Sequence, residues 1–239
     1  MNVTVDIGNS FIKIALFEGN LMIKHFQHNE LTSDNLCEIL NEFHPQNGIL
    51  CSVKKDEPWL TELLSKRLNY FYELTPQLPL PLDIGYQTPH TLGMDRVAAA
   101  VGAWSEKPHA NLLVIDIGTA ITIDFVTSTG VYQGGNISPG PDLRFKALNA
   151  YTDRLPLVDA DGALPAFGCD TETAIRSGVI GGIVRELDAY INEQQKKAEV
   201  FSFLTGGYAF YFENKLKSRT FADENLVPKG LNTILNYQK

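Results

Sequence analysis

The sequence predicts an α/β fold made of two similar lobes, and two observations support this prediction. Segments 3–10 and 113–120 share an apolar run, then Asp-Ile-Gly, then a small residue, and they lie 110 residues apart. Each is followed by strand-like and then helix-like runs, an alternation typical of α/β folds. The chain has 239 residues, enough for two domains of ordinary size. We therefore expect an N-terminal lobe at 1–110 and a C-terminal lobe at 111–239.

The first half predicts three consecutive strands followed by alternating helices and strands. Each Asp-Ile-Gly segment reads as the bend of a β-hairpin, because a β-rich run precedes it and another follows it. Leu36, Ile39, Leu40 and Phe43 recur at helical spacing behind Thr32, a candidate cap. The expected elements are a first strand that ends at residue 7, strands at 11–17 and 21–25, a helix at 32–43, a strand at 48–53, a helix at 56–68 and a strand at 70–74.

The second half repeats this order. Its expected elements are strands at 112–117, 120–126 and 131–136, a helix at 171–195, a strand at 200–204, a helix at 207–216 and a closing helix at 229–237. A duplicated βββαβα unit is similar to the two ribonuclease-H-like lobes that face a nucleotide cleft in the acetate kinase, hexokinase, Hsp70 and actin superfamily. This analogy predicts a fold and sets an expectation for function.

Composition excludes several classes of protein. With 20 Lys and Arg against 28 Asp and Glu, the net charge is −8, so we expect no nucleic-acid partner. No stretch is apolar enough for a membrane span and the N-terminus lacks a signal pattern, so we expect a cytoplasmic protein. Three cysteines without ligand spacing argue against structural zinc and against a disulfide framework.

Both hairpin bends offer the groups that nucleotide phosphates need, which are backbone N–H groups, little side-chain bulk and a carboxylate. At the first bend Gly8 and Ser10 present N–H groups and a hydroxyl, Lys13 adds positive charge, and Asp6 is a candidate ligand for Mg²⁺. At the second bend the hydroxyl of Thr119 repeats the arrangement. A single bend of this kind is more often a simple turn, so the prediction depends on finding two in register.

Two further glycine-rich segments are candidates for the same cleft. Gly206 and Gly207 follow a predicted strand and precede a helix, so they predict an adenosine-binding junction, although a plain helix-start turn fits equally well. The segment 134–140 predicts a turn that closes the cleft over a substrate. The chain contains neither a P-loop motif nor a Rossmann glycine fingerprint.

Asp95 is the candidate general base. It opens an alanine-rich segment that predicts a helix, where the helix dipole favours an ionised carboxylate, and Arg96 beside it is suited to an anionic substrate. In phosphoryl transfer such a base orients the accepting hydroxyl toward the γ-phosphate. The alternative is an acidic residue that only stabilises the first turn of a helix.

With these motifs in order, the chain resembles the type III pantothenate kinases, bacterial enzymes that phosphorylate pantothenate in the first step of coenzyme A synthesis. Segments 6–13, 93–96, 116–122 and 134–140 carry the resemblance, which covers nearly the whole chain. It implies that ATP is bound by Asp6, Ile7, Gly8, Asn9, Ser10, Phe11, Ile12, Lys13 and Thr119. It implies that pantothenate is bound by Tyr86, Gly93, Met94, Asp95, Arg96 and Thr171.

The resemblance also implies that Asp95 is the proton acceptor, that Mg-ATP is the phosphoryl donor, that Asp116 binds a monovalent cation (K⁺ or NH₄⁺), and that the protein is a homodimer. Ser10 replaces the commoner threonine and keeps a hydroxyl, whereas Ile121 loses one. Structural alternatives stay open for Tyr86 as a packed loop aromatic and for Thr171 as a helix cap.

No chemistry is assigned to Asp124, which reads as a buried, hydrogen-bonded carboxylate. Two other functions remain to be distinguished from pantothenate phosphorylation. A different kinase or phosphohydrolase of the same superfamily would turn over ATP without depending on pantothenate. A non-catalytic regulator would be expected to lack the carboxylates and hydroxyls that both bends keep.

Overall fold

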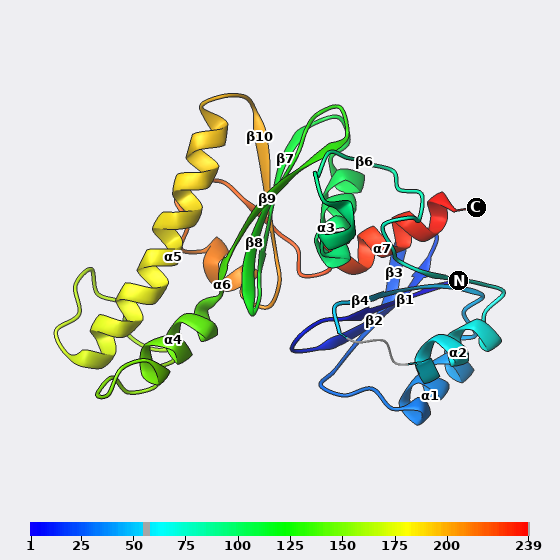
Figure 1. Cartoon of the computed structure of the whole chain (residues 1–239), viewed down its shortest axis with the longest axis horizontal. Helices are drawn as coiled ribbons and strands as arrows, with labels where there is room; N and C mark the ends of the chain where they lie inside the picture. Colours follow the sequence, from blue (N-terminus) through cyan, green and yellow to red (C-terminus); the bar gives the residue numbers. More distant parts are fainter. Residues whose placement is uncertain (55–57, 239) are drawn as a thin grey trace. The chain divides into compact units, whose positions relative to one another are not determined.

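The computed structural model describes residues 1–54 and 58–238, and two β-sheets organise them (Figure 1). In spatial order the first sheet consists of β3 (Leu21–His28), β2 (Ile12–Glu18), β1 (Asn2–Ile7), β4 (Asn47–Ser52) and β5 (Tyr70–Glu73). The second consists of β11 (Phe221–Ala222), β10 (Val200–Thr205), β7 (Asn111–Ile117), β8 (Ala120–Val126), β9 (Val131–Pro139) and β6 (Asp83–Ile84).

The two sheets share one topology. Read from β9 to β11, the second sheet has the order β9-β8-β7-β10-β11, which matches the order β3-β2-β1-β4-β5 of the first. In both sheets the strand that carries Asp-Ile-Gly pairs in parallel with the fourth strand of its repeat, β1 with β4 and β7 with β10. The predicted duplication of a βββαβα unit is therefore confirmed.

Helices follow the strands in a similar order in each repeat, except that two helices rather than one follow the third strand of the second repeat. They are α1 (Ser33–Phe43), α2 (Pro58–Arg67), α3 (Met94–Glu106), α4 (Pro141–Ala150), α5 (Thr171–Gln195), α6 (Ala209–Glu213) and α7 (Leu226–Tyr237), with a short 3-10 helix at Pro89–Thr91. Among the described residues, no helix combines the length and apolar character needed to cross a membrane.

The chain divides into two compact units that are not identical with the two sequence repeats. The first unit comprises Met1–His109, Phe125–Gly134 and Asn225–Lys239, and the second comprises Ala110–Asp124 and Gly135–Glu224. The last helix of the second repeat, α7, therefore belongs to the first unit. The boundary at residue 110 describes the repeats and stays a prediction for the lobes.

Side chains alternate across the first sheet. Val3, Val5 and Ile7 of β1 join a buried cluster with the apolar residues of α1 and α2, such as Leu40 and Leu64. Successive residues of a strand point to opposite faces, so the even-numbered residues of β1 face the other side. That side is covered by α7, which packs on β1 and β4 (Figure 1).

Four asparagines, hereafter the asparagine cluster, fasten α7 to this sheet. Asn2 donates from Nδ2 to Oδ1 of Asn232 at 2.8 Å and to Oδ1 of Asn236 at 2.9 Å, while Asn47 donates to Asn2 at 3.0 Å. Asn232 in turn donates to the carbonyl oxygen of Gly19 at 2.9 Å. Since Asn2 and Asn232 are only 4% and 2% exposed, these bonds satisfy amides that water does not reach.

The final helices of the two repeats, α3 and α7, cross at glycines. A Cβ atom at Gly102 of α3 would lie 2.2 Å from the carbonyl oxygen of Leu226, and one at Gly230 of α7 would lie 1.8 Å from that of Ala98. No side chain fits at these distances, so the two backbones approach each other directly. This contact fixes the helix whose first turn carries Asp95.

One sequence prediction is wrong: residues 134–140 do not form a turn. β9 continues through this segment to Pro139, and Gly140 is the N-cap of α4. The glycines serve close strand packing, because a Cβ at Gly135 would lie 2.0 Å from the carbonyl oxygen of Ile123 on β8. Gly134 has φ +118°, a conformation that favours glycine.

The remaining helix predictions are mostly confirmed, with shifted ends. The expected helix at 171–195 matches α5, and Thr32 caps α1 by accepting a hydrogen bond from the N–H of Asn35 at 3.2 Å. The expected start of the second helix at 56 lies outside the described residues, α6 is shorter than 207–216, and α7 starts at Leu226 rather than 229. β6, β11 and α4 were not predicted.

Candidate active site

Asp6 lies near the end of β1, with a charged and a sulfur-containing neighbour. Lys13 of β2 is opposite it in the antiparallel register, and Cys51 of β4 is opposite it in the parallel register. Residues paired in register lie on the same face of a sheet. Asp6 therefore shares with Lys13 and Cys51 the face that α7 covers, and it is 9% exposed.

The first predicted phosphate-binding bend, residues 8–11, is tight and open to solvent. The N–H of Gly8 donates to the carbonyl oxygen of Phe11 at 3.0 Å, and Asn9, Ser10 and Phe11 are exposed. A Cβ at Gly8 would be 3.1 Å from that oxygen, which is a crowded contact. The bend thus has the geometry of an accessible backbone turn, and its binding of phosphate stays a prediction.

Asp95 is the second residue of α3, and its carboxylate turns back over the helix N-terminus. Oδ1 accepts a hydrogen bond from the N–H of Arg96 at 2.9 Å. A Cβ at Gly93, the N-cap, would lie 2.6 Å from that oxygen and 3.6 Å from Cδ of Arg96. Glycine at this position therefore leaves room for the carboxylate, and the positive end of the helix dipole favours its ionised form.

Asp95 and Asp6 both lie near Cys51. Burial raises the pKa of the Cys51 thiol well above its ordinary value, and the negative charges of Asp6 and Asp95 raise that pKa further. The geometry agrees, because Cys51 is paired with Asp6 in the sheet and α3, whose first turn carries Asp95, packs on β4, the strand of Cys51. The structure thus brings together the predicted general base and the first phosphate-binding element.

Tyr86 packs against β9 within the same unit. Its ring lies edge-on to that of Tyr132, with centroids 6.4 Å apart, and its Cδ2 is 3.1 Å from where a Cβ of Gly134 would be. Tyr132 is fully buried, whereas Tyr86 is partly exposed. The packing confirms the structural reading of Tyr86 and leaves part of the side chain accessible; its contact with substrate stays a prediction.

In the second unit, backbone segments close around the bend that carries Thr119. The N–H of Gly140 donates to the carbonyl oxygen of Thr119 at 2.9 Å. A Cβ at Gly140 would lie 2.0 Å from the carbonyl oxygen of Gly118, so the start of α4 rests directly on the bend. Thr119 itself is exposed.

Asp116 lies beside the same bend and beside Gly206. A Cβ at Gly206 would be 2.3 Å from Oδ1 of Asp116 and 2.7 Å from the carbonyl oxygen of Ile117. The next residues continue the contact, because the N–H of Tyr208 donates to that carbonyl at 3.1 Å. The predicted second phosphate element, the predicted cation ligand and the predicted adenosine junction are therefore neighbours.

Thr171 is the first residue of α5 and is exposed, but it is not the cap. Asp170 is the N-cap, and its carboxylate accepts a hydrogen bond from the N–H of Thr173 at 2.8 Å. The same hydrogen bonds from Thr173 lower the pKa of Asp170. The structural alternative for Thr171 is therefore wrong, and its hydroxyl is not used in capping.

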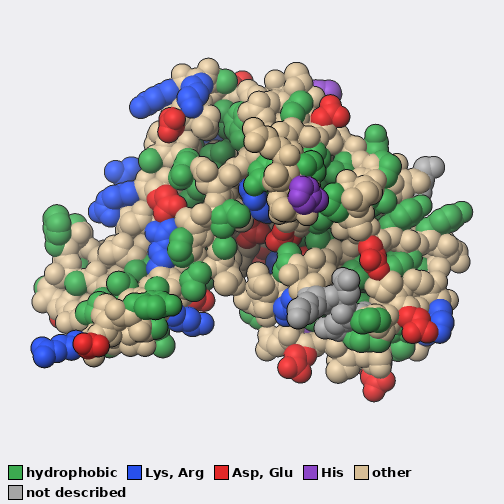
Figure 2. All heavy atoms as spheres, in the orientation of Figure 1, with side chains coloured by type: hydrophobic (Ala, Val, Ile, Leu, Met, Phe, Trp, Pro, Cys, Tyr) green, Lys and Arg blue, Asp and Glu red, His purple; other side chains and the backbone are tan. Residues whose placement is uncertain are grey.

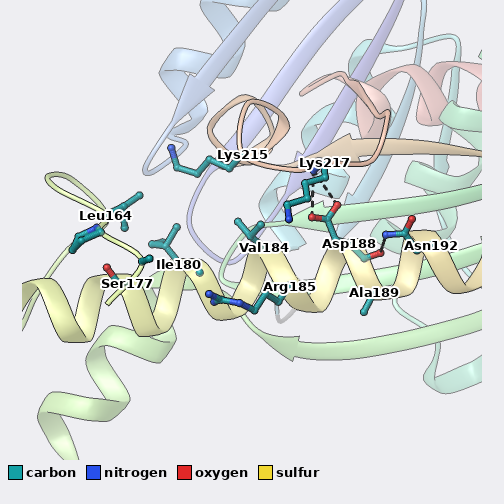
Figure 3. Close-up of a pocket in the computed structure, with 13 residues that line it drawn as sticks. Leu164, Ser177, Ile180, Val184, Arg185, Asp188, Ala189, Asn192, Lys215 and Lys217 are labelled. Atoms are coloured by element: carbon teal, nitrogen blue, oxygen red, sulfur yellow. Dashed lines mark hydrogen bonds between the residues drawn. The ribbon is translucent and has the colours of Figure 1, made fainter. Parts of the chain in front are cut away.

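A separate cavity of about 540 Å³ runs along α5 in the second unit (Figure 3). Ile180 and Val184 line it with Lys215. Asp188 accepts hydrogen bonds from the backbone N–H of Lys217 at 3.1 and 3.3 Å, fastening the segment after α6 to α5. Of the described residues that line this cavity, none is a predicted site residue.

Charged side chains of both signs are interspersed on the face shown in Figure 2, with Lys and Arg in small groups between acidic and apolar residues. The groups that sequence reasoning missed are mostly backbone neighbours. Gly140 is the clearest case: it lies in the predicted segment 134–140, but its hydrogen bond to the carbonyl oxygen of Thr119 was not predicted, although the flanking Pro139 and Pro141 were a signal of a fixed backbone conformation.

Comparison with known proteins supports the same assignment. Residues 2–193 match the family model described as type III pantothenate kinase. A type III pantothenate kinase of Azobacteroides pseudotrichonymphae is 55% identical over 239 residues, covering 100% of this chain and 98% of that protein. One from Bacteroides fragilis is 46% identical over 238 residues, covering 99% and 98%.

Solved structures show the same fold. A Campylobacter jejuni protein of the Baf family has a TM-score of 0.65 at 27% identity, covering 99% of this chain and 98% of that one. A ROK hexokinase from Thermus thermophilus has a TM-score of 0.53 at 12% identity, covering 99% and 98%. The predicted fold class, with two ribonuclease-H-like lobes, is thus confirmed.

Proposed function

The chain belongs to the type III pantothenate kinase family, and we propose that it transfers the γ-phosphoryl group of ATP to the hydroxyl of pantothenate with Asp95 as the general base. Because members of this family are kinases, the chain is a kinase. The family model matches residues 2–193, and the similarity to the Azobacteroides relative extends over the whole chain. The observation that supports the role of Asp95 is the packing of α3, whose first turn carries it, on β4, where Cys51 is paired with Asp6 in the sheet.

The local geometry of Asp95 suits a general base. Asp95 is partly exposed at the start of α3, and Gly93 places no Cβ against Oδ1 of its carboxylate. A base in phosphoryl transfer accepts the proton of the hydroxyl as the new P–O bond forms. Ionisation favoured by the helix dipole keeps Asp95 ready to accept it.

We assign ATP to the two bends that carry Asp-Ile-Gly, residues 6–13 and Thr119. The support is structural: the first bend is open to solvent with Lys13 beside Asp6, and Thr119 of the second bend is an exposed residue. Amino and N–H groups neutralise the charge of phosphates, and Mg²⁺ accompanies the nucleotide as part of the substrate. Tyr86, the segment 93–96 and Thr171 remain for pantothenate.

Asp116 fits a monovalent cation. Its Oδ1 and the carbonyl oxygen of Ile117 both approach Gly206, which has no side chain to fill the space beside them. Oxygen donors of this kind suit hard cations. When bound, K⁺ or NH₄⁺ would supply positive charge beside the phosphates, and replacing either ion with Na⁺ in the assay should lower activity.

A homodimer is the assembly we propose, and exposed apolar side chains of the second unit support it. Tyr151 and Phe167 are 89% and 92% exposed, and a cavity of about 580 Å³ lined by Leu143, Leu148 and Ile175 lies between α4 and α5. Exposed apolar surface of this kind marks interaction sites. Sedimentation equilibrium should give twice the chain mass, and a monomer at micromolar concentration would refute this part.

The decisive experiment measures phosphorylation of pantothenate by the purified protein and by Asp95→Asn. We expect kcat to fall by about 10²–10⁴-fold, the usual contribution of a general base, with little change in the affinity for a non-hydrolysable ATP analogue. Asp34→Asn is the matched control, since Asp34 is also a first-turn acid, on α1, and is exposed. ATP turnover without pantothenate dependence would refute the proposed substrate.

A further inference from the structure

We propose that the ion pair between Arg144 of α4 and Glu186 of α5 positions the Gly118–Thr119 bend for the phosphates of ATP. The inference rests on the proposed function, because it takes Thr119 to be an ATP contact. Neither side chain is among the predicted site residues, and both act through the backbone that touches the bend.

The ion pair is hydrogen-bonded to the end of β9. Arg144 donates from Nη2 to Oε2 of Glu186 at 2.6 Å and from Nε to the carbonyl oxygen of Pro139 at 2.7 Å. Ser138 completes the arrangement by donating from Oγ to Oε1 of Glu186 at 2.8 Å and accepting from Arg144 at 3.2 Å. Both carboxylate oxygens of Glu186 are thus engaged, and the backbone at Pro139 is tied to the long helix α5.

Gly140, the residue after Pro139, connects this restrained backbone to the Gly118–Thr119 bend. Gly140 donates its N–H to the carbonyl oxygen of Thr119 at 2.9 Å. A Cβ at Gly140 would be 2.0 Å from the carbonyl oxygen of Gly118 and 2.7 Å from that of Thr119, so no gap separates the two segments. A shift of Pro139 and Gly140 therefore displaces the bend itself.

A second tie holds the first turn of α4 to the predicted adenosine junction. Tyr208, two residues after Gly206, donates its hydroxyl to Oδ1 of Asp142 at 2.5 Å. Desolvation and the nearby Asp142 raise the pKa of Tyr208, so the hydroxyl stays a donor at physiological pH. The Tyr208–Asp142 hydrogen bond links α4 to the segment that follows β10, whereas the Arg144–Glu186 ion pair links α4 to α5. The two interactions therefore restrain α4 from different sides.

The expected consequence is selective for ATP. Thr119 is exposed, and its backbone carbonyl is held by the N–H of Gly140, so a shift of Gly140 moves the residue that we propose as the ATP contact. Charge-assisted hydrogen bonds between partly buried groups, such as those of Arg144 and Glu186, are among the stronger side-chain interactions. Losing one loosens the bend, which weakens phosphate binding more than pantothenate binding.

Glu186→Gln tests the proposal because it keeps the size and shape of the side chain while removing its charge. We expect KM for ATP to rise by about fivefold to twentyfold, with KM for pantothenate changed by less than about twofold. Arg144→Lys keeps the charge but loses the fork that reaches both Pro139 and Glu186, and it should give an intermediate rise.

Glu193→Gln is the matched control. Glu193 lies on the same helix and pairs with Lys197 at 3.2 Å, but this pair is exposed and lies away from β9. Its KM values should equal those of the unmodified enzyme. In a double-mutant cycle, Glu186→Gln combined with Arg144→Met should raise KM for ATP no more than the larger single effect, because both changes break the same contact.

Two results would overturn the proposal. One is a lower melting temperature of Glu186→Gln with an unchanged KM for ATP, which would make the pair structural only. The other is an equal rise in KM for both substrates, which would mean a general disturbance of the site. Failure of the proposed function is distinct, because then the unmodified chain would form no phosphopantothenate.

Discussion

Gly230→Ala is expected to destabilise the first unit and to lower kcat together. The added Cβ would lie 1.8 Å from the carbonyl oxygen of Ala98, 2.7 Å from its carbonyl carbon and 2.8 Å from the backbone nitrogen of Gly102. All three are backbone atoms of α3, so no side-chain rotamer relieves the overlap. Separation of the helices is the remaining response, and ordinary contact distances require a shift of more than about 1 Å.

The magnitude follows from two opposing terms. Overpacking a close contact costs about 3 kcal/mol at the upper end of the usual range, and Ala in place of Gly in a helix interior returns about 1 kcal/mol. The net loss of about 2 kcal/mol corresponds to a melting temperature lower by about 4–8 °C for a chain of this size. Ala98 is one turn from Asp95, so a displacement of about 1 Å there can reduce kcat by up to about 10²-fold.

Thermal unfolding followed by circular dichroism and steady-state kinetics check this expectation. Gly182→Ala is the matched control, because Gly182 is also inside a helix, α5, and a Cβ at this position would meet no atom within 4 Å. That substitution should raise the melting temperature by about 2–4 °C. If Gly230→Ala melted at or above the temperature of the unmodified protein, the backbone contact between α3 and α7 would be refuted.

Three further predictions concern single groups. Asn232→Leu removes the acceptor for Asn2 and should cost about 2 kcal/mol in urea unfolding, with an unchanged m-value. The pKa of Asp170 is lowered in the folded state, so its stabilisation is present above about pH 4 and is lost as pH falls through the folded pKa; Asp170→Ala should flatten the acid limb of the melting curve. The pKa of the Cys51 thiol is raised in the folded state, so its contribution to the free energy of unfolding is fully present below about pH 8.5 and is lost as pH rises through the folded pKa. We expect Cys51 to react with thiol reagents more slowly than the exposed Cys169, and equal rates in the native protein would contradict the raised pKa.

The repeat was predictable from the sequence because it is local. Each Asp-Ile-Gly segment combines a β-rich run with a glycine bend, and these signals lie within about ten residues. The matching strand orders of the two sheets follow from that duplication. The helix at 171–195 was also predictable, since the run contains no proline, although the sequence reading offered Thr171 as the cap and the structure places the cap at Asp170.

The errors have tertiary causes. Glycines at 134–140 indicate a turn when the segment is read alone. In the structure Gly135 is needed because the backbone of β8 lies so close that a Cβ at this position would overlap it. α7 was expected to start after Pro228, whereas proline is tolerated in the first turn of a helix, where its missing N–H has no intrahelical acceptor. The contact of Gly206 with Asp116 joins residues far apart in the chain, and no local pattern reports it.

The two bends differ in the residues that lie beside their aspartates, and therefore in local charge. In the first copy the carboxylate of Asp6 faces Lys13 across the hairpin and Cys51 on the parallel strand. In the second copy Thr205 holds the position of Cys51 beside Asp116, and the residue 110 positions after Lys13 is Ile123. The first copy thus has its own cation beside the acid, which favours a role in balancing phosphate charge. The second has the hydroxyl of Thr205 and the carbonyl oxygen of Ile117 instead, and this difference in donors supports the proposal that Asp116, and not Asp6, binds the monovalent cation.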